Sequence, residues 1–324
     1  MLDIEERNQT SIREFILLGL GNFPQLQLFL SWFFLVIYLM TITGNLLIFL
    51  LVHLHTPMYF FLAKLSCLDT CYSSIFLPKM LANLLTDKRS ISVRECLAQY
   101  HIFCICAALE TYLLAVMSYD RYSAICRPLV YASVMNRKFC FQLMAGIWIN
   151  SFIFNVVLIS FVAQLSFCGP NVIDHYFCDL RPLMKLSCSD TSLFELFAFC
   201  MTIIFTIPPF LLTLISYICI ICAILKIQST TGRQKAFSTC SSHLMVVCLY
   251  YGTLIIVYAL PDTPSLRPLN KIFSIFYTVM TPLVNPFIYT LRNKEIHKAL
   301  RRLCDKMVYG MCHLKLLTSF QFTK

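Results

Sequence analysis

The sequence predicts an all-α membrane protein: a bundle of seven transmembrane helices with its N-terminus outside the cell. Three observations support this fold class. The chain is 58% apolar and only 13% charged, it contains seven long apolar segments, and its basic residues are distributed unequally between the segments that connect them. Soluble domains carry about 25% charged residues. This chain therefore has too little polar surface for a water-soluble globule, and lipid must solvate much of it.

Seven segments are long enough to cross the hydrocarbon core, which requires about 20 mainly apolar residues. They are residues 26–51, 58–85, 97–119, 139–165, 196–225, 236–261 and 272–291. The first and fourth are the clearest, since residues 15–52 and 139–173 contain no Asp, Glu, Lys or Arg. We expect all seven to be helical, because an open chain in lipid satisfies its backbone groups only as a helix. Residues 26–291 are thus the predicted transmembrane domain.

The basic residues decide the orientation, because Lys and Arg accumulate in cytoplasmic loops. An outside N-terminus leaves nine basic residues outside: Arg7, Arg13, Lys88, Arg89, Arg94, Arg181, Lys185, Arg267 and Lys271. It places fifteen inside: Arg121, Arg127, Arg137, Lys138, Lys226, Arg233, Lys235, Arg292, Lys294, Lys298, Arg301, Arg302, Lys306, Lys315 and Lys324. The basic residues of the cytoplasmic segments also account for the net charge of +10. A nucleic-acid-binding protein is not indicated, since no basic stretch interleaves with aromatic residues outside the apolar segments.

The two ends are predicted to lie on opposite sides of the membrane. Residues 1–25 form an extracellular tail, in which the tripeptide Asn8-Gln9-Thr10 is an N-glycosylation acceptor at Asn8. Residues 1–14 lack the apolar core of a secretory leader, so the first apolar segment is expected to act as the insertion signal. Residues 292–324 are the cytoplasmic end, and residues 166–194 form the longest connection.

Most of the 17 cysteines lie inside apolar segments, where Cys behaves as a small apolar residue. Four lie in or near extracellular segments, where disulfides persist: Cys96, Cys168, Cys178 and Cys188. Four cysteines allow three pairings, and the spacing alone does not choose among them.

Two carboxylates interrupt the predicted spans, Asp69 in the second and Glu110 in the third. An ionisable group within a membrane is costly, so it indicates a functional site. If both face one wet cavity, they could hold a cation or share a proton. The alternative is that each is only hydrogen-bonded within the bundle.

Other polar and helix-bending residues mark the cytoplasmic half. Asp120-Arg121-Tyr122 ends the third span, and Arg121 needs a carboxylate, water or a partner protein because it cannot lose its charge. In the seventh span, Asn285 precedes Pro286, which removes a helical hydrogen bond and bends the helix. Pro208-Pro209 should likewise bend or break the fifth helix.

One face of the third helix, in its outer half, suits a small uncharged ligand. Residues at steps of about three and four share a helix face; here they are Tyr100, Cys104, Ala107, Ala108 and Thr111. The face is small and apolar with no carboxylate, so a charged amine ligand is not expected there. An apolar pocket with few polar groups is typical of small-molecule sites. The alternative is that these residues only pack helices together.

The motifs together resemble those of the olfactory receptors, a branch of the rhodopsin-like (class A) G-protein-coupled receptors. Over roughly residues 8–303 they are Gly44-Asn45, LHTPMYFFLAKLSCLD at 54–69, MSYDRYSAICRPL at 117–129, HYFCD at 175–179, Ser216-Tyr217, KAFSTCSSHL at 235–244 and PLVNPFIYTLRNKE at 282–295. The last two are similar to the tetrapod-type (class II) branch. The resemblance implies an odorant receptor in the plasma membrane of olfactory-neuron cilia. It would bind a small volatile odorant and activate a heterotrimeric stimulatory G protein that raises cyclic AMP.

The resemblance also implies roles for matching positions. Cys96 would bond Cys178, and Cys168 would bond Cys188. Asp69 and Glu110 would form a cluster linked to an allosteric sodium ion, with no other cofactor. The activation switch would comprise Asp120, Arg121, Tyr122, Tyr217, Asn285, Pro286 and Tyr289. Tyr251 would be a hinge beneath the ligand, and the far side of the pocket would contain Phe205, Leu254, Ile255, Tyr258 and Thr278. Lys294–Leu303 would form a short amphipathic helix on the inner leaflet.

Three alternatives remain to be considered, and expression data are needed to separate the first of them. A receptor of the same kind expressed outside the nose has the same sequence features. A transporter or proton channel would use Asp69 and Glu110 and would carry flux without a G protein, but no long internal repeat supports it. An enzyme is not expected, because no nucleophile motif is present. The seven histidines form no metal-spaced pair: His53, His55, His101, His175, His243, His297 and His313.

Overall fold

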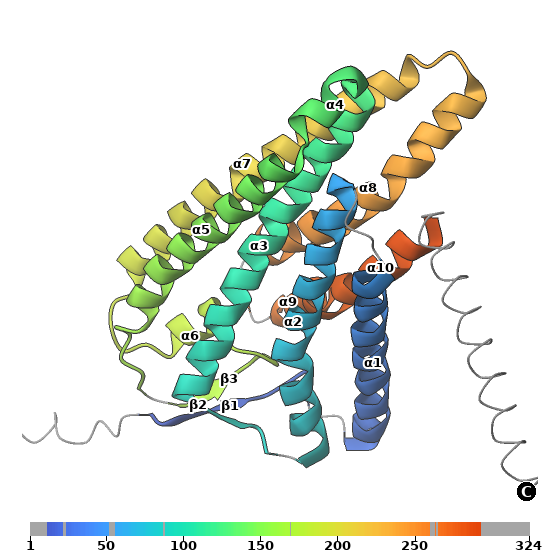
Figure 1. The fold of residues 1–324 in the computed structure, drawn as a ribbon. Helices are drawn as coiled ribbons and strands as arrows, with labels where there is room; N and C mark the ends of the chain where they lie inside the picture. The colour runs from blue at the N-terminus through green and yellow to red at the C-terminus, as the bar shows by residue number, and fades with distance from the viewer. Residues whose placement is uncertain are drawn as a thin grey trace, which may run out of the picture.

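The computed structural model describes residues 12–21, 24–51, 56–86, 88–168, 170–259, 263 and 265–292. Within that part of the chain, seven helical segments are long and apolar enough to cross a membrane. They form one bundle with small extracellular and cytoplasmic elements at its two ends (Figure 1). The predicted seven-helix fold is confirmed, while Asn8 and the predicted helix Lys294–Leu303 lie outside the described residues.

The first three long helices are α1 (Gln27–Leu51), α2 (Pro57–Thr86) and α3 (Val93–Cys126). Helix α3 extends beyond the apolar pattern at both ends. At its start, Ser92 accepts a hydrogen bond from the Glu95 backbone N–H, and the Glu95 side chain accepts one from the Ser92 N–H. This reciprocal cap stabilises a helical start that contains charged residues, which a search for uncharged segments cannot detect.

The next helices are α4 (Pro128–Val134), α5 (Arg137–Val162), α6 (Leu180–Lys185) and α7 (Ser192–Leu225). Pro208 and Pro209 lie inside α7, which continues through them, so the helix is not broken there. Prolines are tolerated in transmembrane helices when neighbouring groups satisfy the backbone. One turn further on, the Thr213 hydroxyl adds a hydrogen bond to the Pro209 carbonyl at 2.9 Å.

The last span has three parts. After α8 (Thr230–Ala259), α9 (Arg267–Ile275) leads through a π-helical turn, η3 (Phe276–Met280), into α10 (Thr281–Arg292). The π turn widens the helix just before Pro282 and Pro286, where the normal hydrogen-bond pattern is interrupted. At Gly44 of α1, a Cβ atom would lie 3.1 Å from the Cβ of Pro286. Glycine therefore lets α1 and α10 approach closely.

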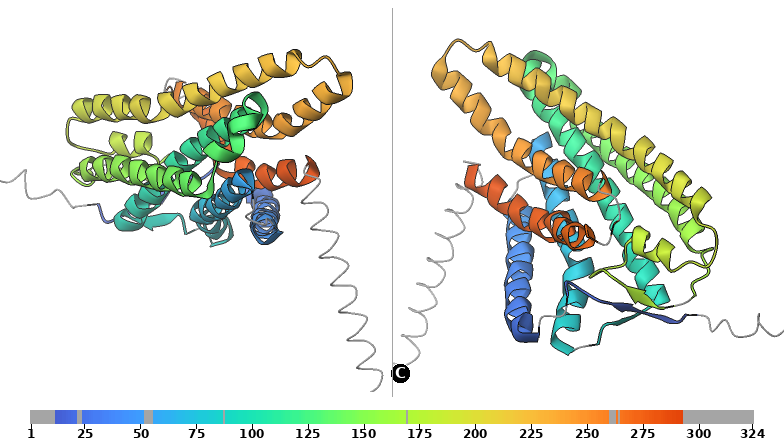
Figure 2. Two further views of the ribbon diagram at one scale, coloured as in Figure 1. Left: turned by 45° about the horizontal axis from the view of Figure 1, so that its top comes forward. Right: turned by 180° about the vertical axis from the view of Figure 1, so that it is seen from behind.

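Helix α3 is the central element: it crosses the bundle between α2 on one side and α5 and α7 on the other (Figures 1 and 2). Its middle is buried throughout, from Leu113 to Ser118. In contrast, α1, α5 and α7 expose large apolar side chains along their outer faces. An apolar exterior around a partly polar interior is expected where lipid covers the outside.

A small sheet covers the extracellular end, in the order β2-β1-β3. Strand β1 (Glu14–Leu17) pairs antiparallel with β2 (Ser90–Ser92) and parallel with β3 (Val172–Ile173). Phe15 and Leu17 of β1 are fully buried, which fixes the register because alternate residues face the bundle. No strand was expected in the predicted tail 1–25, since both partners of β1 are far away in the chain.

Candidate functional site

The buried polar centre joins α1, α2, α3 and α10. The Asn285 side-chain amide donates to the Asp69 carboxylate at 2.9 Å, and the Asn45 amide donates to the Pro282 carbonyl at 3.0 Å. Glu110 on α3 is fully buried beside this group, close enough for its charge to interact with that of Asp69. Both predicted carboxylates therefore belong to one interior cluster.

Several oxygens of this centre accept no hydrogen bond from the described residues: both carboxylate oxygens of Glu110, Oδ1 of Asp69 and Oδ1 of Asn285. Oxygen donors without partners in a buried site suit a hard cation such as sodium. Within the described ranges, no group of three or more His, Cys, Asp or Glu residues could hold a metal ion. Sodium binding at Asp69 and Glu110 stays a prediction.

The side chains of the predicted ligand face of α3 differ in how deeply they are buried. Tyr100 and Thr111 are buried, whereas Cys104, Ala107 and Ala108 are half-buried. At its inner end, the Thr111 hydroxyl donates to the Ala107 carbonyl at 2.8 Å. The predicted ligand face therefore combines small, half-buried side chains with a polar floor at Thr111.

Two tyrosines of α8 complete that floor. The Tyr250 hydroxyl lies 3.0 Å from the Thr111 hydroxyl and donates to the Ala107 carbonyl at 2.9 Å. Tyr251 donates to the Thr111 carbonyl at 3.1 Å. Tyr251 was in the predicted set and Tyr250 was not, although it is fully buried. Its neighbouring position in the same Tyr-Tyr-Gly stretch was the available signal.

The remaining predicted pocket residues have different surroundings. Phe205 of α7 packs against Phe154 with ring centroids 4.7 Å apart. Leu254 is half-buried and Thr278 is buried, with its hydroxyl 2.8 Å from that of Tyr176. The side chain of Tyr258 lies outside the described residues.

Ile255 is the exception among the predicted pocket residues. It is 53% exposed and continues an exposed stripe of α8 that includes Met245 and Cys248. These positions share one helix face, and that face turns away from the bundle. The orientation argues against a ligand contact, so we remove Ile255 from the pocket.

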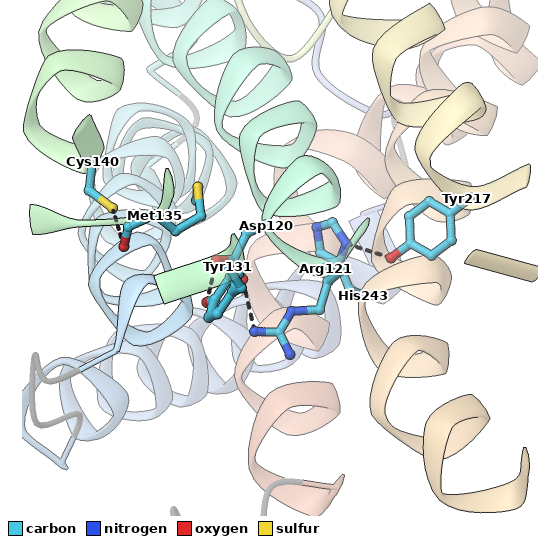
Figure 3. A network of polar contacts seen from close by, with 7 residues as sticks. All are labelled: Asp120, Arg121, Tyr131, Met135, Cys140, Tyr217 and His243. Atoms are coloured by element: carbon cyan, nitrogen blue, oxygen red, sulfur yellow. Dashed lines mark hydrogen bonds and ion pairs between the residues drawn. The ribbon is translucent and has the colours of Figure 1, made fainter. Parts of the chain in front are cut away.

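At the cytoplasmic end, Asp120 holds both Arg121 and a tyrosine from α4. The Arg121 guanidinium lies 2.9 Å from one Asp120 carboxylate oxygen, and the Tyr131 hydroxyl donates to the other at 2.8 Å (Figure 3). Asp120 is fully buried, whereas 16% of the Arg121 side chain is exposed. Burial and the Asp120 carboxylate raise the pKa of Tyr131, so its hydroxyl remains a donor.

A second contact joins α7 and α8 beside Arg121. The Tyr217 hydroxyl lies 2.6 Å from Nδ1 of His243, and both side chains are buried (Figure 3). Tyr289 of α10 is also buried, and its hydroxyl has no hydrogen-bond partner in the described part of the chain. From the sequence, His243 is expected to be an ordinary helix residue, and its position near the end of the KAFSTCSSHL stretch is the only sequence signal for this contact.

The extracellular loop between α5 and α7 is held over the bundle by covalent and polar contacts. Cys96 is bonded to Cys178, with Cα atoms 5.5 Å apart, and Cys168 is bonded to Cys188 within the loop. Lys271 of α9 lies 2.5 Å from the carboxylate of Asp174. The loop is therefore connected to both α3 and the final span.

Next to that ion pair, His175 is packed among aromatic rings. Its ring centroid lies 4.7 Å from that of Tyr176 and 4.5 Å from that of Phe177. Burial, and then the Lys271 charge, lower the pKa of His175 to about 3. The imidazole is therefore neutral in the folded protein at physiological pH.

Comparison with known proteins identifies the architecture. The family model described as "Olfactory receptor" matches residues 34–306. The chain belongs to the olfactory receptor family. Similar relatives include olfactory receptor 1f45 of Rattus norvegicus, 48% identical over 91% of this chain and 96% of the relative. Olfactory receptor 8G1 of Homo sapiens is 45% identical over 92% of this chain and 97% of the relative.

Membership settles the broad function. This olfactory receptor is a multi-pass membrane protein and not an enzyme, and its family acts by coupling odorant binding to a G protein. The transporter alternative is therefore set aside.

Proposed function

We propose that this receptor binds small, mostly apolar, uncharged volatile molecules in the outer half of the bundle, and that binding activates a stimulatory, olfactory-type G protein to raise cyclic AMP. We also assign it to the tetrapod-type (class II) branch and to the cilia of olfactory neurons. The composition of the α3 face supports this class of ligand. Cys104, Ala107 and Ala108 are small and half-buried, and hydroxyl groups rather than carboxylates form the floor below them.

The expected affinity follows from ligand size. An odorant of about ten non-hydrogen atoms gains roughly 6–8 kcal/mol at an efficiency between the drug-like and best-fragment limits. This corresponds to a dissociation constant on the order of micromolar or weaker. Signalling then depends on how differently the odorant binds the inactive and active conformations, rather than on tight binding.

The proposed transmission runs through α8. Tyr250 and Tyr251 connect the pocket floor to α8 through Thr111, and His243 connects the same helix to Tyr217 at the other end. A ligand that displaces α8 at the floor would weaken the lower contact and move the segment 235–243 outward. Arg121 would then exchange Asp120 for the G protein, as a two-state switch requires.

Sodium is proposed to act as an allosteric ligand at Asp69 and Glu110. The ion would supply positive charge that stabilises two neighbouring carboxylates. Replacing Asp69 with Asn should abolish any difference in odorant potency between NaCl and an organic-cation buffer. Unchanged sodium sensitivity in Asp69→Asn would contradict the site.

The test of the function is odorant-dependent cyclic AMP in transfected cells, with a panel of neutral odorants and volatile amines matched in size. Neutral odorants should raise cyclic AMP, and Arg121→Ala should abolish the response at equal surface expression. A matched control is Arg137→Ala, since Arg137 is an exposed cytoplasmic residue at the start of α5. Full signalling by Arg121→Ala would overturn the mechanism, and a response confined to amines would overturn the ligand class.

A further inference from the structure

A groove separate from the Arg121 switch lies between the cytoplasmic ends of α7 and α8. Its volume is about 470 Å³, within the range of cavities that hold small organic molecules. One wall is formed by Ile221, Ile224 and Leu225 of α7, and the other includes Arg233 and Phe237 of α8. Figures 1 and 2 show these helices joined by a loop at the end of the bundle where α4 lies.

The apolar wall is open to the surroundings of the bundle. Leu225 is 63% exposed and Phe237 is 56% exposed. In a membrane, such side chains contact lipid tails rather than water. The groove is therefore accessible from the bilayer, whereas the Tyr217–His243 contact is buried within the bundle.

The depth of the groove matches the boundary between tails and headgroups. Lys226 is the first charged residue after the apolar part of α7, and Lys235 is the last charged residue before the apolar part of α8. Arg233 precedes Lys235 by two residues, about 3 Å along the helix axis. Headgroup regions extend roughly 5–8 Å beyond the hydrocarbon core on each side. A long arginine side chain at this position can therefore reach a lipid phosphate.

The charge of the groove is uniformly positive. Lys226 follows α7, Arg233 lies on the wall, and residues 196–261 contain no Asp or Glu. One guanidinium N–H of Arg233 donates to the Ile227 carbonyl at 3.1 Å, which orients the side chain. Among the described residues, no carboxylate pairs with it. Arginine offers five donors, so most of this group is available to an anion.

We propose that the groove binds an anionic phospholipid of the inner leaflet. One acyl chain would lie along Ile221, Leu225 and Phe237, and Arg233 would bind the headgroup phosphate. Basic pockets between transmembrane helices on the cytoplasmic side bind anionic headgroups in this way. A lipid held between α7 and α8 contacts the two helices that are joined by Tyr217 and His243. It can therefore influence their separation, and with it the response of the receptor.

The test uses the purified full-length receptor in detergent and does not require an odorant. Native mass spectrometry would measure retention of dioleoyl phosphatidylserine against dioleoyl phosphatidylcholine. Arg233→Gln should weaken phosphatidylserine retention about fivefold, the effect of one cationic contact near a membrane surface. Arg233→Lys should restore most of it. Arg137→Gln is the matched control, since it removes an exposed cytoplasmic arginine outside the groove and should leave retention unchanged.

A second variant tests the apolar wall. Leu225→Trp should fill the groove and reduce phosphatidylserine retention, with folding checked by size-exclusion chromatography. Equal retention of both lipids, equal losses in Arg233→Gln and Arg137→Gln, or full retention in Leu225→Trp would each overturn the proposal. So would loss of G-protein binding in Leu225→Trp with lipid retention unchanged, because the groove would then hold the G protein.

Discussion

The Tyr217 hydroxyl and Nδ1 of His243 lie 2.6 Å apart and join α7 to α8. Both groups are buried, so water cannot replace the bond readily. Separation of these helices requires this contact to break or to exchange partners. The pair therefore contributes to the free-energy difference between the receptor's conformations.

Removing this hydrogen bond should raise basal signalling. We expect Tyr217→Phe and His243→Leu each to increase odorant-independent cyclic AMP by roughly two- to tenfold, since a hydrogen bond contributes about 0.5–1.5 kcal/mol. The double variant should add little, because both single changes remove the same contact. Basal cyclic AMP normalised to surface expression is the measurement. Fully additive effects would show that the two residues act separately.

Tyr250 should stabilise the pocket floor through its hydroxyl. Tyr250→Phe keeps the ring and removes the hydrogen bond to the Ala107 carbonyl, so it should lower the free energy of unfolding by about 1 kcal/mol. Tyr250→Ala also leaves a cavity and should cost about 3–5 kcal/mol. Thermal unfolding of the purified receptor measures both changes. An unchanged unfolding temperature in Tyr250→Phe would contradict a stabilising contribution from the hydroxyl.

The close approach of α1 and α10 requires a glycine at position 44. Gly44→Ala would place a methyl group 3.1 Å from Pro286, and we expect it to destabilise the receptor by about 1 kcal/mol. The control is Gly146→Ala on α5, where a Cβ meets no atom within 4 Å. That change should be neutral or stabilise the helix by up to about 1 kcal/mol. A stabilising Gly44→Ala would refute the packing argument.

The extracellular loop should lose stability in acid because of His175. Its pKa is lowered from 6.5 to about 3, so between these values the unfolded chain binds a proton that the folded protein does not. The free energy of unfolding is therefore highest with respect to His175 at neutral pH, and it decreases as the pH falls below about 6.5. From pH 7 to 5.5 the loss should be about 1 kcal/mol.

The variant His175→Phe should reduce this acid sensitivity, as measured by thermal unfolding at several pH values. Asp179 acts in the opposite direction, because burial raises the pKa of its carboxyl group. That carboxyl group is present in both proteins, so its contribution cancels when the two pH profiles are subtracted. Identical profiles would show that His175 is not responsible.

Several site features could be predicted from the chain because they depend on residue type and depth. Asp69, Glu110 and Arg121 are conspicuous as charges in or beside apolar segments, since burying a charge is costly. Their partners could not be predicted in the same way. Asn285 meets Asp69 across 216 positions, and Tyr250 meets Thr111 across 139. Such pairs depend on the rotation and depth of each helix.

Other features depend on tertiary contacts that local preference does not describe. Pro208 and Pro209 predicted a bend or a break, and α7 continues through both without a break. Ile255 matched a pocket position, yet it faces away from the bundle with the stripe that includes Met245. Strand β1 exists because β2 and β3 provide distant hydrogen-bond partners. Sequence patterns describe one segment at a time and do not contain these relationships.

The amino-acid sequence alone determined the number of spans, their orientation and the family, because hydrophobic length and loop charge act on each segment independently of its neighbours. The tertiary structure decided which side chains meet: the contact of Tyr217 with His243 and the groove beside Arg233. It also confirmed the Cys96–Cys178 link that the family resemblance implied. The physical reason is that helices in lipid associate through close packing and hydrogen bonds between surfaces. Those surfaces become neighbours only when the whole bundle is assembled.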